Sequence, residues 1–260
     1  MHVKNSVGII LCSKNENNLE VLLVKKRCSY AYCDFIKGGT YFTTSKNFEK
    51  MTRDEMSDIL KLDFKRMWDR YIPYNFNKDN YDKKYILFFE RYIKKDSGKM
   101  LINLINSTHR KINLFWECPK GGRRINKTGT KEDSLLCAIR EFEEETSIKQ
   151  TSYTILNNVY RYISHISNKI TYKTKYYVAY TNKLININNK FENIIKTNEI
   201  IDIGWFNIEK LHYLDLVGEA YNISNLIKPI FNLIKKEKFN KKNVIKNNIK
   251  IIIDDINSKC

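Results

Sequence analysis

The sequence predicts an α/β fold in which a helical insert separates two sheet-forming segments. Two short apolar runs, 6–12 and 21–24, flank a polar turn, which is the pattern of a β-hairpin. Residues 35–112 instead place apolar side chains at three- and four-residue intervals, which is typical of amphipathic helices. Strand-like runs then return at 114–118, 153–163, 169–181 and 202–206, before a helical run at 221–236.

Three helical runs make up the insert, and they set the expected division of the chain. Apolar residues repeat with helical spacing over 54–71, 85–93 and 100–105. The α/β part is therefore interrupted in sequence. We expect an α/β domain formed by 1–34 and 113–260, a helical insert at 35–112, and a basic helix and tail at the end of the second segment.

Basic residues are in clear excess and are unevenly spread. The 260 residues include 46 Lys and Arg against 29 Asp and Glu, a formal net charge of +17. Residues 35–112 hold 17 basic against 10 acidic residues, and residues 228–260 hold 9 against 3. A positive field favours polyanionic partners such as nucleic acid, polyphosphates or anionic membranes. An AT-rich coding sequence, which favours Lys, Asn and Ile, would explain part of the same excess.

Aromatic residues lie among the charges of the insert. This interleaving suits single-stranded RNA, whose bases stack on aromatic rings while Lys and Arg follow the phosphates. Many of these rings are nevertheless expected in the core of the insert. The nine residues are Trp68, Tyr71, Tyr74, Phe76, Tyr81, Tyr85, Phe88, Phe89 and Tyr92.

Several classes of protein are disfavoured. No stretch approaches the roughly 18 apolar residues that span a bilayer, and the first residues lack the order of a secretory signal. Six cysteines without a CxxC pair indicate free thiols in a reducing compartment, and the four histidines show no spacing typical of zinc ligands. We therefore expect a soluble protein with no membrane partner.

The segment 130–148 carries the most informative pattern in the chain. Thr130 followed by Asp133 predicts a capped helix that begins near Lys131. Apolar residues at helical spacing define one face of this helix that should be buried. They are Leu135, Leu136, Ile139 and Phe142.

Three glutamates, Glu141, Glu144 and Glu145, share the arc of this helix away from that apolar face. Like-charged pairs three or four residues apart destabilise a helix by roughly 0.2–0.5 kcal/mol each, so something should neutralise the cluster. Mg²⁺ does so well, because it binds carboxylate oxygens and bridges to substrate phosphates. A solvated acidic helix without a ligand is the alternative.

The spacing of the charged residues decides between these interpretations. Glu132, followed after seven residues by Arg140–Ile148 (REFEEETSI), resembles the Nudix box, G-x5-E-x7-R-E-U-x-E-E-x-G-U with U an apolar residue. Pro119–Gly122 resembles the strand-to-loop entry of that family. The resemblance implies a Nudix fold, an α/β/α sandwich with a mixed sheet, here interrupted by the helical insert.

The same resemblance implies a hydrolase that cleaves a diphosphate joining a nucleoside or a related group to another moiety, with Mg²⁺ or Mn²⁺ as cofactor. Arg140 would hold a neighbouring glutamate by an ion pair, and Glu132 would be mainly structural. The implied metal ligands are Glu141, Glu144, Glu145 and the backbone carbonyl of Gly121.

Two positions depart from the family pattern. Nine residues separate Gly122 from Glu132, so the loop is four residues longer than usual. Ser147 stands where the family has a glycine in the left-handed conformation, which costs about 1 kcal/mol or less. Neither change removes a chemical group, so we expect activity.

Glu199 lies just before a Trp-containing strand-like run. In many Nudix enzymes a glutamate at such a place contacts the metal or acts as the base on the attacking water. Glu199 is therefore a further candidate catalytic residue, and a surface carboxylate without a role is the alternative.

The resemblance extends beyond the box to the mRNA-decapping branch of the Nudix family, known from African swine fever virus and other giant DNA viruses. The segments 6–10, 23–27, 29–31, 35–36, 62–68 and 114–146 are similar to that branch in the same order. It implies removal of the 5′ cap from capped mRNA in the host cytoplasm, with release of m7GDP and 5′-monophosphate RNA. It also implies a second activity on diphosphoinositol polyphosphates. The sequence leaves the oligomeric state open.

Cap removal brings a triphosphate bridge close to clustered carboxylates, so basic side chains should hold the phosphates. Two other functions stay open. One is a pyrophosphohydrolase for diphosphoinositol polyphosphates or nucleotides, and the other is a catalytically inactive RNA-binding module, against which the intact box argues. The candidate phosphate contacts are Lys25, Lys26, Arg27 and Lys120 near the α/β core and Lys65 and Arg66 in the insert.

Overall fold

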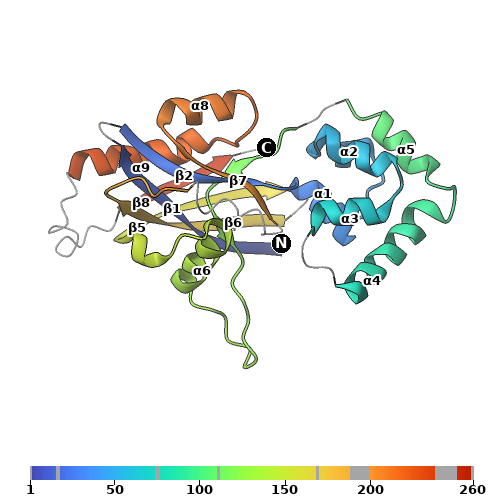
Figure 1. Cartoon of the computed structure of the whole chain (residues 1–260), viewed down its shortest axis with the longest axis horizontal. Coiled ribbons are helices and arrows are strands. Elements are labelled where there is room, and N and C mark those ends of the chain that lie inside the picture. The colour runs from blue at the N-terminus through green and yellow to red at the C-terminus, as the bar shows by residue number, and fades with distance from the viewer. Residues whose placement is uncertain are drawn as a thin grey trace.

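The computed structural model of the chain describes residues 2–15, 18–73, 77–109, 112–167, 170–187, 199–237 and 251–258. Figure 1 shows a sheet covered by helices beside a separate lobe of helices. The strands are β1 (His2–Asn15), β2 (Asn18–Lys26), β3 (Trp116–Glu117), β4 (Lys120–Gly121), β5 (Thr154–Ser167), β6 (Ile170–Thr181), β7 (Ile200–Phe206) and β8 (Ile251–Ser258). The α-helices are α1 (Tyr30–Lys37), α2 (Arg53–Leu60), α3 (Phe64–Tyr71), α4 (Lys78–Phe88), α5 (Lys99–Asn106), α6 (Ser134–Thr146), α8 (Ile208–Leu216) and α9 (Ile223–Glu237). Shorter helical segments are η1 (Ser45–Lys50), η2 (Phe89–Ile93) and η3 (Gln150–Ser152).

The sheet is mixed, with its main strands in the order β3-β2-β1-β6-β5-β8. The expected hairpin of β1 and β2 is antiparallel, whereas β1 and β6 run parallel along residues 2–13 of β1. Two further strands join the sheet, because β4 pairs with β1 and β7 pairs with β2. The chain segments on both sides of the helical lobe therefore form one sheet.

Apolar side chains occupy both faces of the central strands. Ile10 and Leu23 belong to a core shared with α8 and α9, whereas Ile9 and Leu22 belong to a core shared with α6. Successive side chains of a strand point to opposite faces, so a strand covered on both sides needs a continuous apolar run. The predicted α/β/α sandwich with a mixed sheet is confirmed.

The helical lobe has its own core, which contains Phe35, Phe48, Ile59, Trp68 and Leu101. It begins earlier than the expected boundary at residue 35. Helix α1 starts after Ser29, whose side chain accepts a hydrogen bond from the backbone of Tyr32. The buried face of α1 packs into the core of the lobe, so the helical part already begins there.

The aromatic residues of the lobe divide between core and surface. Trp68, Phe88 and Tyr92 are buried, while Tyr85 and Phe89 are exposed. Most of the rings form edge-on or tilted pairs with one another. Tyr74 and Phe76 lie outside the described residues.

Two expected helices have different bounds in the structure. The run 54–71 forms two helices, because Leu62 adopts a left-handed conformation with φ of 54° and Asp63 caps a new helix by accepting from the backbone of Arg66. The helix expected from Lys131 begins at Ser134, where Asp133 accepts from two backbone N–H groups. Leu136, assigned above to the buried face of that helix, is 63% exposed.

The helices and the end of the chain bear on two further expectations. Within the described ranges, no helix combines the length and the apolar character needed to cross a membrane. The sequence pattern missed α8 and β8, and β8 pairs in parallel with β5. Of the expected basic tail, residues 238–250 and 259–260 lie outside the described residues.

Candidate active site

Arg140 of α6 holds three carboxylates together, two from the same helix and one, Glu132, from the loop before it. Its guanidinium lies 2.8 Å from Glu132, 2.7 Å from Glu141 and 3.0 Å from Glu144. It also donates to the backbone carbonyl of Gly122 at 3.2 Å. The hydrogen bonds from Arg140 and from the backbone of Arg124 lower the pKa of Glu132 to about 2, so this carboxylate is ionised at neutral pH.

Glu145 lies inside the protein, although the helical arc placed it with its two neighbours at the surface. It is 4% exposed, its carboxylate meets the ammonium of Lys26 at 2.5 Å, and it accepts from the backbone of Lys120 at 3.2 Å. The angular position on α6 was correct, but the end of β2 and strand β4 cover that side of the helix. Burial raises the pKa of Glu145 to about 7 against the opposing effect of Lys26.

Lys26 is shared by three carboxylates. Besides Glu145, it lies 3.6 Å from Glu117 on β3 and 3.4 Å from Glu199, which precedes β7. Burial alone would lower the pKa of Lys26, but the adjoining Glu145 and Glu117 outweigh it and raise the pKa. Lys26 is therefore a permanent cation inside an acidic cluster.

Glu117 extends this cluster toward the helical lobe, and the sequence pattern had not singled it out. Lys120 lies 2.5 Å from its carboxylate, and the hydroxyl of Tyr30 lies within hydrogen-bond distance of both residues. Burial alone would raise the pKa of Glu117, but Lys120 and Lys26 lower it. The one available signal in the sequence was the opposite charge of Glu117 and Lys120, three residues apart at the strand-to-loop entry. That signal does not indicate the contact with Tyr30.

Two glycines allow the loop before α6 to approach the sheet and the helix closely. A Cβ atom on Gly8 would overlap the carbonyl of Pro119, which accepts from the backbone of Ile9. A Cβ atom on Gly121 would overlap the carboxylate of Glu141. Because neither glycine has a side chain, β4 can lie against β1 at Gly8, and the Glu141 side chain fits beside Gly121.

The longer loop before α6 forms a small hairpin, which projects beside the helix in Figure 1. Asn126 orders its turn by accepting from the backbones of Thr128 and Thr130, and Ile125 forms a bridge with Lys131. At its base, Arg124 donates to Glu144 at 2.9 Å. The base of the loop thus places a second arginine at Glu144, which Arg140 also binds.

The other predicted phosphate contacts are more scattered. Lys25 points to the opposite face of β2, where it lies 3.4 Å from Glu219 and 5.6 Å from the ring centroid of Trp116, so the structure does not bring it to the carboxylates. Arg27 donates to the carbonyl of Ile200. Lys65 and Arg66 lie on α3 in the helical lobe, where they form ion pairs with Asp69 and Asp58.

Glu199 and the predicted metal ligands are only partly brought together by the structure. Glu199 is close to Lys26, but its side chain is 73% exposed. Within the part of the chain that the structure describes, no three His, Cys, Asp or Glu side chains are grouped so that they could share one metal ion. The cause is visible in the ion pairs: Arg140 draws Glu141 and Glu144 toward itself, whereas Lys26 draws Glu145 the other way.

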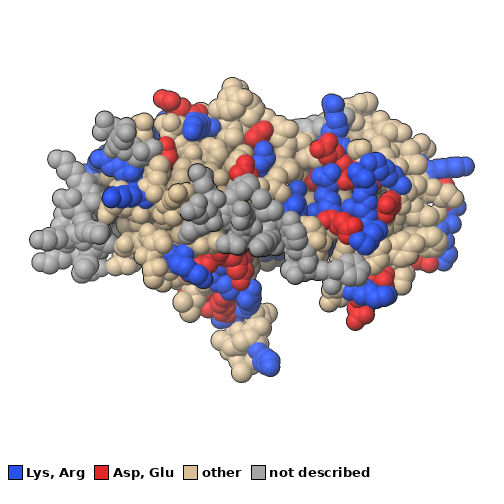
Figure 2. All heavy atoms as spheres, viewed as in Figure 1, with Lys and Arg blue, Asp and Glu red and all other residues tan. Residues whose placement is uncertain are grey.

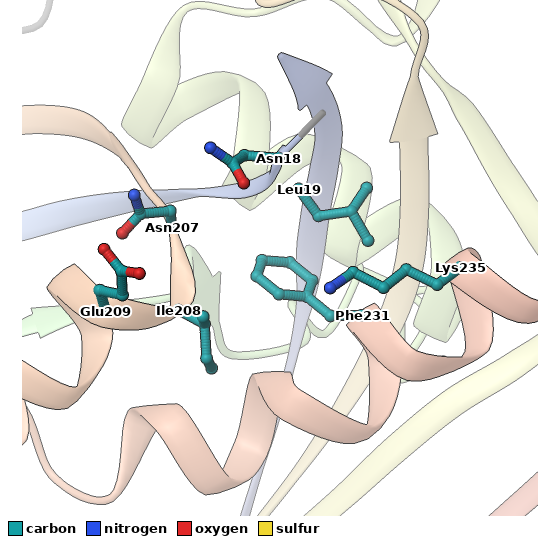
Figure 3. A pocket seen from close by; sticks show the side chains of 7 residues that line it. All are labelled: Asn18, Leu19, Asn207, Ile208, Glu209, Phe231 and Lys235. Carbon is teal, nitrogen blue, oxygen red and sulfur yellow. The ribbon is translucent and has the colours of Figure 1, made fainter. Parts of the chain in front are cut away.

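A small pocket lies on the other side of the sheet from α6. Figure 3 shows its lining residues from the start of β2, the start of α8 and helix α9. Its volume is about 50 Å³, room for about one or two water molecules and too little for a nucleotide. The candidate active site is therefore not this pocket but the group of carboxylates and cations around Arg140 and Lys26, called the carboxylate cluster below. Its members are Lys26, Glu117, Lys120, Glu132, Arg140, Glu141, Glu144, Glu145 and Glu199.

Comparison with known proteins assigns the family. The profile of the NUDIX domain matches residues 91–226, which is about half of the chain and includes the whole of α6, the helix that carries the glutamates. The chain belongs to the Nudix family. The family predicted from Glu132 and Arg140–Ile148 is thereby confirmed, and with it the expected class of enzyme, a pyrophosphohydrolase.

Its relatives include viral proteins. The chain is 36% identical over 245 residues to the mRNA-decapping protein g5R of African swine fever virus, across 90% of this chain and 97% of that protein. It is 27% identical over 221 residues to a putative mRNA-decapping protein of Acanthamoeba polyphaga mimivirus, across 75% of this chain and 60% of the relative. A solved C. elegans Ap4A hydrolase in a binary complex is 12% identical, with a TM-score of 0.45 over 90% of this chain and 98% of that chain.

Gly121 gives a direct test of the site geometry. Gly121→Ala is expected to displace the Glu141 carboxylate and to lower the rate of pyrophosphate hydrolysis by about tenfold to a hundredfold. Gly122→Ala is the matched control, because no atom lies within 4 Å of a Cβ atom built there. The measurement is the initial rate on a substrate that the wild type hydrolyses. Equal rates for the two alanine variants would contradict the assignment of Glu141.

Glu145 predicts a pH-dependent difference in stability. Its pKa in the folded protein is about 7, above the usual 4.5. Its contribution to the stability of the folded state is therefore complete below pH 4.5 and is lost as the pH rises through 7. The free energy of unfolding of Glu145→Gln should therefore exceed that of wild type by about 1–3 kcal/mol at pH 8 and by much less at pH 5. Urea unfolding at both pH values measures this. A variant less stable than wild type at pH 8 would show that the Lys26 ion pair outweighs burial.

Proposed function

We propose that this Nudix enzyme removes the 5′ cap of mRNA, releasing m7GDP and RNA with a 5′-monophosphate. The observation that carries the proposal is the extent of the similarity to the viral decapping protein. It covers 97% of that protein and so includes both the helical lobe and the carboxylate helix. A shared Nudix box alone would leave the substrate undefined, because the box supplies the chemistry and not the recognition.

The carboxylates of α6 are the kind of oxygen donor that a hard divalent cation such as Mg²⁺ or Mn²⁺ prefers. Among the described residues they are not grouped around one point, so they would have to turn from their ion-pair partners to share one ion. Glu141, Glu144 and Glu145 occupy adjoining turns of one helix, and each already has a cationic partner. Burial raises the pKa of Glu141 despite the nearby Arg140, so its ionised form would gain from a further positive charge. We assign Glu141, Glu144, Glu145 and the carbonyl of Gly121 as the metal ligands. The bound cation would activate water and screen the charge of the phosphates.

The residues of the chain divide the remaining tasks. Arg140 and Arg124 orient Glu144, while Lys26 and Lys120 place two ammonium groups where the phosphate bridge must approach the carboxylates. Without such cations the bridge and the glutamates would repel each other. Glu199 is exposed at the same cluster, and we assign it the task of accepting a proton from the attacking water.

The helical lobe would hold the RNA that follows the cap. Figure 2 shows Lys and Arg side chains gathered on the visible face of this lobe, together with Asp and Glu. In this lobe, the buried Asp58 of α2 pairs with Arg66 and Arg70 of α3 and with Lys61 at the end of α2. Phosphates can bind at such partly exposed cations without reading the sequence, and the contacts weaken with salt. The basic residues of α2 and α3 are Arg53, Lys65, Arg66 and Arg70, and Lys61 directly follows α2.

Two variants of α6 test the enzymatic part of the proposal. Glu144→Gln should lower m7GDP release from cap-labelled RNA by about a hundredfold or more in the presence of Mn²⁺. Glu143→Gln is the control, because Glu143 contacts Lys149 and the backbone of Gln150 at the end of the helix. Full activity of Glu144→Gln, or no m7GDP from wild type, would contradict decapping. Turnover of a diphosphoinositol polyphosphate without release of m7GDP would identify the alternative substrate.

The helical lobe gives a separate prediction for RNA binding. The double variant Lys61→Ala/Lys65→Ala should weaken binding of a capped RNA at low salt and lower the salt slope by roughly 0.7 for each lost phosphate contact. Lys210→Ala/Lys235→Ala, on α8 and α9, is the control with the same change in charge. Filter binding across a salt series measures both. Equal losses in the two double variants would place the RNA elsewhere.

A further inference from the structure

Tyr30 joins the helical lobe to the carboxylate cluster while leaving its ring in solvent. It is the first residue of α1, and residues 32, 35 and 36 form the face of α1 that is buried in the lobe. Tyr30 points the other way, toward β3. Its hydroxyl lies 2.8 Å from Glu117 and 2.7 Å from the ammonium of Lys120. The residue is nevertheless 60% exposed, so charged partners enclose the hydroxyl end and the ring remains accessible.

The backbone that carries Tyr30 is fixed as well. Ser29 donates through both its N–H group and its hydroxyl to the carboxylate of Glu55, at 2.7 and 2.8 Å. Glu55 is buried, and it also caps α2 by accepting from the backbone of Thr52. Both ends of the Tyr30 side chain are thus held, and a ligand would find the ring in place with little further loss of conformational entropy.

Two other exposed tyrosines lie in different surroundings. Tyr41 donates to the backbone carbonyl of Arg91 inside the helical lobe, and Tyr213 lies on α8. Tyr30, in contrast, hydrogen-bonds to Glu117 and to Lys120 of the carboxylate cluster. Lys120 lies 5.4 Å from the centroid of its ring. An accessible ring and an ammonium group therefore stand side by side, as the base and the phosphates of one nucleotide require.

We propose that the ring of Tyr30 is the platform on which the base of the cap stacks while Lys120 and Lys26 hold the adjoining phosphates. The proposal rests on the decapping function and names the residue that recognises the base. Stacking of a base on an aromatic ring is tolerant of its exact substituents and strong enough to orient it. Tyr30 is here a recognition residue, and the chemistry stays with the glutamates of α6.

The experiment compares two ligands that share a phosphate chain and differ in the base, m7GTP and inorganic tripolyphosphate. Calorimetric titration of the full chain should show that Tyr30→Leu weakens m7GTP binding by about tenfold and leaves tripolyphosphate binding unchanged. Tyr213→Leu, another exposed tyrosine, should change neither affinity. Equal losses for both ligands would mean that Tyr30 only orders the lysines, and an unchanged affinity for m7GTP would mean that the cap base binds elsewhere. Either result overturns the proposal.

A second variant reports proximity and does not depend on activity. In Tyr30→Trp, m7GTP should quench the added fluorescence, whereas tripolyphosphate should not, and wild-type protein provides the background from its three native tryptophans. No quenching beyond that background would count against stacking. Failure of the decapping function is recognised separately, because wild-type protein would then release no m7GDP from capped RNA whatever the outcome of these titrations.

Discussion

Repulsion among carboxylates is the constraint that shapes the corner between α6 and the sheet. Two like charges 4 Å apart repel by about 4 kcal/mol at an effective dielectric constant of 20, a large fraction of the stability of a domain. The structure answers with two separate cations. Arg140 serves the carboxylates at the surface of α6, and Lys26 serves those covered by the strands. The strand ends, the loop and the helix that meet here supply the members of these pairs.

The helix that carries the chemistry could be predicted from sequence because its information is local. The spacing of Glu132, Arg140 and the following glutamates identifies the family without any knowledge of the fold. The burial of Glu145 could not be predicted in the same way. A helical pattern gives the angle between side chains, but which elements cover each angle depends on the pairing of β4 with β1 and on where β2 ends. Glu117 and Tyr30 enter the site through strand pairing and helix docking, and neither leaves a local spacing signal.

The same distinction holds for the fold. Alternating and helical periodicity located the hairpin, the helical lobe and the last long helix, since each buries its apolar residues with a fixed period. The break between α2 and α3 was missed because Leu62 keeps the apolar spacing while its backbone turns left-handed. The start of the lobe was placed too late because α1 has only eight residues, too few for a clear period. Cap residues, Ser29 and Asp63 in these cases, were the better markers of the boundaries.

The helical lobe is inserted between two strands that lie side by side. Chain leaves the sheet at the end of β2 and returns at β3, where Val24 pairs with Glu117 and the backbone of Lys26 donates to Phe115. The lobe is thus joined to the sheet at one narrow place, where β2 ends and β3 begins. Because the chain crosses between lobe and sheet next to Lys26 and Glu117, a shift of the lobe would change the distance between these two side chains, which is 3.6 Å. The same two residues act on the charge of Glu145, so the position of the lobe and the ionisation of Glu145 would change together.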